Sequence, residues 1–124
     1  MDSFQQAANP QSSSGITAAL DRLWERFLPE IRGRVALIES AGIALRDGIP
    51  NPVQQQAAHA AAHKLAGVLG SFGLALGTDL ARKAELLLAE REMPGRIEPA
   101  ELLRLAAGLR ALVESRGAPA NPTN

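Results

Sequence analysis

Apolar positions along most of the chain recur at spacings of three and four residues, which is the period of a helix with one buried face. This spacing predicts helices over 16–28, 29–46, 52–76, 79–90 and 99–116. The first is short, and the other four are joined by brief turns. We therefore expect an all-α protein, an antiparallel four-helix bundle with an additional short N-terminal helix.

Pro29 divides the first two of these stretches. Proline is tolerated in the first turn of a helix and breaks a helix interior, so a second helix is expected to begin there. The apolar positions before it form one stripe, of which Trp24 and Phe27 are assigned to the core. The positions of this stripe are Ile16, Leu20, Leu23, Trp24 and Phe27. Those of the second helix are Ile31, Val35, Ile38 and Leu45, with Leu37 beside them.

Polar residues mark the starts of the later helices. Asn51 can cap a helix whose first residue is Pro52, and Thr78 can cap the stretch that follows Gly77. Pro99 opens the last helix. The core face of the third helix is predicted to comprise Ala58, Ala62, Leu65, Leu69, Phe72 and Leu76. The fourth should bury Leu80, Ala84, Leu87 and Leu88, and the last Leu102, Leu105, Ala106, Leu109 and Val113.

The two ends of the chain carry little that could be buried. Residues 1–15 and 117–124 are rich in Gln, Ser, Asn, Pro and Gly, so disordered tails are expected there. The 124 residues, 46% of them hydrophobic, suffice for one core. A single helical domain is therefore expected over 16–116.

Composition narrows the function classes. The absence of cysteine excludes disulfides and cysteine-based metal or redox sites, and it suits a reducing compartment, so a cytoplasmic location is expected. Thirteen basic residues balance thirteen acidic ones without a basic block, which argues against nucleic-acid binding. There is no secretory signal and no transmembrane run, so no membrane association is expected.

His63 lies on the outer side of the third predicted helix. At about 100° per residue it is roughly 140° from the centre of the apolar stripe, with Gly67 and Gly70 within about 40° of it. Each interior glycine costs a helix roughly 1 kcal/mol relative to alanine. The two glycines could leave a bare strip through which another molecule reaches the imidazole. They could instead allow close packing of helices, and the two interpretations are compatible.

His59 and His63 form an i, i+4 pair, a spacing that could hold zinc. However, Ala60 stands where a metalloprotease motif would carry glutamate, and no third ligand is evident. We therefore expect no metal, and we regard His59 as a solvated side chain.

The segment "HKLAGVLGSFGL" resembles the signature of histidine-containing phosphotransfer (HPt) domains. The matching positions are His63, Leu65, Gly67, Phe72 and Gly73. The later segment "LARKAELLL" resembles the next helix of that family and includes an acidic residue, Glu85. The resemblance covers roughly residues 16–115. Many members carry lysine three residues after the histidine, where this chain has Ala66.

The resemblance implies that His63 accepts a phosphoryl group from the aspartyl phosphate of a response-regulator receiver domain and passes it to another receiver. A hybrid histidine kinase could be a further partner. The receiver would supply the aspartate and Mg²⁺, so this chain would bind no cofactor itself. The candidates for contacting phosphate or partner are Lys64, Gly67, Gly70, Arg82, Lys83 and Glu85.

A neutral imidazole is nucleophilic at neutral pH, and phosphoryl transfer needs mainly alignment and charge stabilisation. The chain has no GxxxxGK[ST] loop. We therefore expect a phosphotransfer protein with a phosphohistidine intermediate rather than an ATP-dependent kinase, acting as a monomer. The alternative is a helical module that binds a partner without transferring phosphate.

Overall fold

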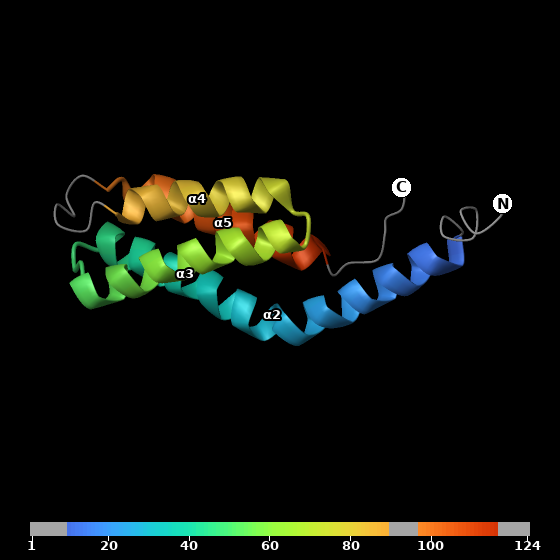
Figure 1. The fold of residues 1–124 in the computed structure, drawn as a ribbon. Coiled ribbons are helices and arrows are strands. Elements are labelled where there is room, and N and C mark those ends of the chain that lie inside the picture. The colour runs from blue at the N-terminus through green and yellow to red at the C-terminus, as the bar shows by residue number, and fades with distance from the viewer. Residues whose placement is uncertain (1–9, 90–96, 117–124) are drawn as a thin grey trace.

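The computed structural model describes residues 10–89 and 97–116, with side chains described from residue 15 onward. Its helices are α2 (Pro10–Arg46), α3 (Pro52–Ser71), α4 (Ala75–Leu88) and α5 (Pro99–Arg116). The three shorter helices lie beside the C-terminal half of α2 (Figure 1). The described residues contain no strand, which confirms the all-α bundle.

The two helices predicted on either side of Pro29 are one continuous helix, so that prediction was wrong. Proline removes one backbone hydrogen bond and crowds the preceding turn, which kinks a helix without having to end it. Figure 1 shows α2 bending near its middle. Ile31 and Val35 are buried just after the proline, so packing holds the second half of the helix in the bundle.

The N-terminal half of α2 extends beyond the bundle (Figure 1). The helix begins at Pro10, inside the segment predicted to be a disordered tail. Proline is well suited to the first turn of a helix. The rest of that predicted tail, and the one at 117–124, lie outside the described residues. Trp24 is 1% exposed and confirmed as core, but Phe27 is 41% exposed. Its assignment to the core was therefore wrong.

The core is built from all four helices and from Ile97, just before α5. The predicted inward face of α5 is confirmed at every position. Asn51 caps α3, because its side chain accepts a hydrogen bond from the backbone N–H of Gln54 at 3.1 Å. The fully buried large apolar side chains are Trp24, Ile31, Val35, Ile38, Leu65, Leu69, Leu88, Leu102, Leu109 and Val113.

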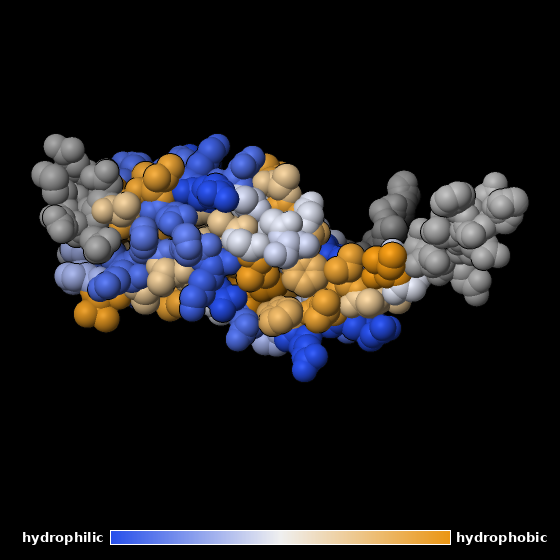
Figure 2. Space-filling model, viewed as in Figure 1, coloured by the Kyte–Doolittle hydropathy of each residue, from blue (hydrophilic) through white to orange (hydrophobic). Residues whose placement is uncertain are grey.

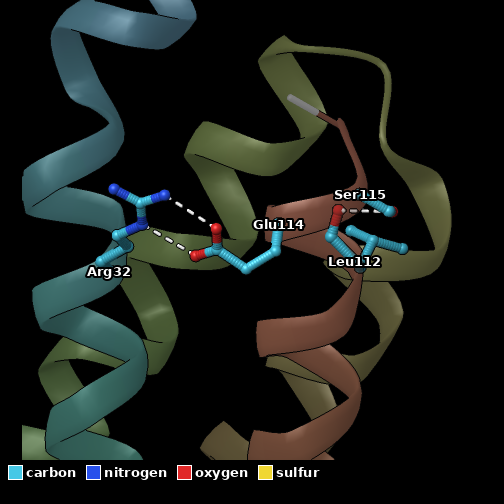
Figure 3. Close-up of polar contacts among 4 residues, drawn as sticks. All are labelled: Arg32, Leu112, Glu114 and Ser115. Carbon is cyan, nitrogen blue, oxygen red and sulfur yellow. Dashed lines mark hydrogen bonds and ion pairs between the residues drawn. The ribbon is translucent and has the colours of Figure 1, made fainter. Parts of the chain in front are cut away.

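Polar side chains tie α2 to α5 on the surface. Arg32 donates two hydrogen bonds to Glu114, each 2.7 Å long (Figure 3). These bonds lower the pKa of the Glu114 carboxyl and raise the pKa of Arg32. Arg110 also donates to Glu39 at 2.9 Å. These pairs join the two helices at the surface, above the apolar core.

The turn from α3 to α4 depends on Gly73, whose φ is +75°. The N–H of Leu74 donates to the carbonyl of Leu69 at 2.9 Å, and that of Gly73 to Gly70 at 3.0 Å. This is a Schellman ending, which favours glycine at the left-handed position. It stops α3 at Ser71, earlier than predicted.

Helix α4 then starts at Ala75, before the predicted cap. Thr78 lies within the helix and caps nothing at its start, so that prediction was wrong. Leu76, predicted for the core face of α3, belongs to α4 and is 62% exposed. Gly77 is buried, and a Cβ there would lie 2.8 Å from Leu112 and 2.9 Å from Leu69. The missing side chain therefore lets α4 approach α3 and α5 closely.

Candidate functional site

His63 projects from the middle of α3 into solvent. Its side chain is 73% exposed, whereas Ala62 before it and Leu65 after it are fully buried. These buried neighbours fix the rotation of α3, so the position of His63 on the outer face follows from the register of the core. The wheel geometry predicted from the sequence is found in the structure.

The imidazole of His63 is held by a carboxylate from the next helix. His63 Nδ1 lies 2.8 Å from Glu85 Oε2, and the Glu85 side chain is 24% exposed. A carboxylate can only accept a hydrogen bond, so Nδ1 carries the proton and donates it. In the neutral ring Nε2 is then left with a free lone pair. The contact thus selects the tautomer and aims the opposite nitrogen away from Glu85.

The position of Glu85 depends on close packing between α3 and α4. Ala81 and Ala84 are fully buried, and small residues of this kind let two helices approach. The Thr78 hydroxyl donates to the backbone carbonyl of Ala66 at 3.1 Å. This bond joins the two helices between His63 and the end of α3. Sequence reasoning missed this role of Thr78, because it assigned that residue to a helix cap.

The two glycines beside His63 differ in their surroundings. A Cβ added at Gly67 would meet nothing within 4 Å, so this position borders open space. A Cβ added at Gly70 would lie 3.3 Å from Thr78 Oγ1, which is tighter than ordinary contact. Gly67 therefore supports the interpretation of a bare strip near the imidazole, and Gly70 supports close helix packing.

The three basic residues proposed to contact phosphate or partner lie at different angles around their helices. Lys64, Arg82 and Lys83 are all exposed. Arg82 lies three residues before Glu85, about 60° away around α4, whereas Lys83 lies about 160° away on the other side of the helix. Lys64 is about 100° from His63 on α3. Of the two basic residues on α4, Arg82 is thus the one placed on the side that carries Glu85.

Ala66 occupies the position where many HPt domains have lysine. It is 5% exposed, and its carbonyl accepts the Thr78 hydrogen bond. This position therefore belongs to the contact between α3 and α4, and a basic side chain of this chain that reaches the site would have to come from another position.

The described residues give no further ligands to the histidine pair. His59 is partly buried, one turn before His63. Within residues 10–89 and 97–116, no three His, Cys, Asp or Glu side chains lie close enough together to hold a metal ion. None of the described helices is long and apolar enough to cross a membrane.

The site is thus an exposed histidine in the middle of a bundle helix, hydrogen-bonded to an acid on the next helix. The sequence matches the Hpt domain family over residues 22–115, and the chain belongs to that family. Members of the family act in phosphorelays of two-component signalling. The chain is also 34% identical over 88 residues to protein RcaC of Microchaete diplosiphon. That match covers 71% of this chain and 13% of RcaC. No solved structure matches this chain.

Proposed function

We propose that this chain is a phosphorelay intermediate in which His63 carries the phosphoryl group. The observation that supports this most strongly is the contact between Nδ1 of the exposed His63 and Glu85, which leaves the Nε2 lone pair free in the neutral ring. The donor and the acceptor of the group would be receiver domains, one of them within a hybrid histidine kinase. A cytoplasmic location is part of the same proposal.

The chemistry is a direct displacement at phosphorus. The lone pair of His63 Nε2 attacks the phosphorus of the receiver's aspartyl phosphate, and a nitrogen–phosphorus bond forms as the phosphorus–oxygen bond breaks. The aspartate leaves as a carboxylate, so no proton has to be supplied to it. The second transfer runs the same steps in reverse, onto the aspartate of another receiver. The receiver would hold Mg²⁺, which would supply charge neutralisation at the phosphoryl oxygens.

Glu85 has two roles in this scheme. It orients the ring before transfer through the 2.8 Å hydrogen bond. After transfer the imidazole carries the phosphoryl group on Nε2 and a proton on Nδ1, so the ring is cationic. The adjacent carboxylate then stabilises that charge. Arg82 would contact the phosphoryl oxygens, in place of the lysine absent at Ala66, with Lys64 as a second candidate.

Gly67 would keep the approach to Nε2 open, because the position has no side chain of its own and a Cβ there would meet nothing within 4 Å. Phosphoryl transfer depends on in-line alignment of the attacking and leaving atoms, so an unobstructed approach matters more than additional catalytic groups. The chain lacks a P-loop, and we expect no autophosphorylation from ATP.

The proposal is tested by incubating the chain with a panel of receiver domains phosphorylated on aspartate, in the presence of Mg²⁺. One phosphoryl group per chain should be acquired, labile in acid and stable in base. His63→Gln should abolish labelling, His59→Gln should keep most of it, and ATP alone should give none. If no receiver labels the unmutated chain, the partner-binding module without transfer becomes the better account.

A further inference from the structure

The N-terminal half of α2 carries an apolar stripe that the bundle does not cover. Ile16, Leu20, Leu23 and Phe27 follow one another at spacings of four, three and four residues, which places them on a single face. Their exposed fractions are 64%, 39%, 41% and 41%. Figure 2 shows apolar surface running along this projecting part of the helix. We call these four residues the arm stripe.

Part of the arm stripe lies outside the region that the family shares. The Hpt match begins at residue 22, so Ile16 and Leu20 precede it. Residues 15–20 are all exposed. The side-chain ion pairs between α2 and α5 involve Asp21, Arg32 and Glu39 of α2, and the pair Asp21–Arg116, at 3.2 Å, lies nearest the N-terminus of the helix. A short helix that stands alone in water is only marginally stable unless its apolar face packs against another surface. We therefore expect the apolar face of this projecting helix to pack against another molecule.

We propose that the arm stripe is a self-association surface, on which two copies of this chain pair through antiparallel α2 helices. The alternating spacing of four and three is that of a helix pairing seam. About a two-fold axis between Leu20 and Leu23, each Leu20 faces Leu23 of the second copy, and each Ile16 faces Phe27. The two bundles then lie at opposite ends of the pair. This departs from the monomer expected from the sequence.

Charge favours the antiparallel direction. The next position of the seam is Glu30, whose side chain is 63% exposed. In this register Glu30 falls opposite residue 13 of the second copy, in the first turns of a helix that begins at Pro10. That helix has no acidic residue in its first turn. A carboxylate is stabilised by the positive end of a helix dipole, so each Glu30 complements the helix start of the other copy.

The arm stripe is small for an interface. A stable interface of standard size comprises about 20–30 residues on each partner, whereas this stripe has four apolar side chains, three of which are already more than half covered. The dimer is therefore weak, with half-association expected in the upper micromolar range.

Sedimentation velocity of the full chain, from about 10 μM to 1 mM, tests the proposal. The mass should rise from 13.1 kDa toward twice that value as concentration increases. Leu20→Glu and Leu23→Glu should each hold the protein at the monomer mass, with circular dichroism confirming that both remain folded. Leu86→Glu is the matched control, since Leu86 is 71% exposed but lies on α4. This variant should associate as the unmutated chain does.

Two results would overturn the proposal: a mass that stays at 13.1 kDa throughout, or association that survives both arm variants. Receiver binding lost in Leu20→Glu with a monomeric parent chain would assign the stripe to the receiver instead. None of these measurements uses phosphoryl transfer. The self-association proposal can therefore fail while the proposed phosphorelay function stands.

The direction of pairing is tested by a distance between two labels. The chain has no cysteine, so Ser40→Cys gives one spin label per chain at an exposed site of α2. An antiparallel pair should place the two labels roughly 50 Å apart, from the rise of 1.5 Å per residue along α2. A separation below about 30 Å would mean parallel pairing and contradict the arrangement.

Discussion

His63 Nδ1 lies 2.8 Å from Glu85 Oε2, so one hydrogen bond joins the exposed faces of α3 and α4. The two residues are 22 positions apart in the chain. They meet because small buried residues bring the helices together and Gly73 turns the chain sharply between them. The reactivity proposed for His63 thus depends on the packing beneath it.

Removing the carboxylate should slow transfer without unfolding the bundle. Glu85→Ala is expected to reduce the rate of phosphoryl transfer about tenfold or more, since a hydrogen bond to a charged group contributes about 1.5–3 kcal/mol. The transfer rate of Glu85→Gln should lie between those of Glu85→Ala and the unmutated chain. An amide oxygen can still accept a hydrogen bond from Nδ1–H, but it carries no charge. Rapid-quench kinetics with a phosphorylated receiver measure both. Equal rates for all three proteins would show that Glu85 does not position the ring.

A side chain placed in the space beside the imidazole should raise the stability of the fold and lower the rate of phosphoryl transfer. Gly67→Gln is expected to stabilise α3 by up to about 1 kcal/mol through helix propensity, while hindering the approach of the receiver. The matched control is Gly33→Gln in α2, because a Cβ at Gly33 also meets nothing within 4 Å. Denaturation and transfer kinetics should show both variants stabilised and only Gly67→Gln impaired. Unchanged kinetics in Gly67→Gln would remove the argument for a bare strip.

The Thr78 hydroxyl should contribute to the contact between α3 and α4. Thr78→Val loses the hydrogen bond to the Ala66 carbonyl, and we expect the free energy of unfolding to fall by about 1 kcal/mol. Thr78→Ser keeps the hydroxyl and should recover most of this loss. Urea denaturation followed by circular dichroism measures the difference. A valine variant as stable as the serine variant would argue against a role for this bond.

The Arg32–Glu114 pair should make stability depend on pH. Its hydrogen bonds lower the pKa of Glu114 in the folded state, so the pair stabilises the fold above the unfolded pKa of about 4.3. This contribution is lost as the pH falls through the folded pKa, when the carboxylate is protonated.

Glu114→Gln should therefore melt at a lower temperature than the unmutated chain at pH 7, and the difference should close below about pH 4. Added salt should also reduce it, because both side chains are exposed. A melting difference that is the same at pH 3 and pH 7 would contradict this role.

The features that follow from local periodicity and capping could be predicted from the sequence. The inward face of α5 and the Asn51 cap of α3 depend on residues within one helix, and they were predicted correctly. The outward position of His63 follows from the same period. In each case one helix carries all the information that is needed.

The features that depend on neighbouring helices could not be predicted. Phe27 lies on a regular apolar stripe, but periodicity does not say whether such a stripe meets the core or another molecule. Pro29 bends α2 without ending it, because the packing of Ile31 and Val35 outweighs the lost hydrogen bond. Thr78 has the chemistry of a cap, yet the turn at Gly73 places it inside α4, where it bonds across to Ala66.

The measurement that tests the central claim most directly is a long-range ¹H–¹⁵N NMR spectrum of the chain after phosphorylation by a receiver domain. It assigns the phosphoryl group to one nitrogen of one histidine. The arrangement of His63 and Glu85 predicts phosphorylation at Nε2 of His63, with the proton retained on Nδ1. Phosphate on Nδ1 of His63, phosphate on His59, or two unmodified histidine rings would contradict the account.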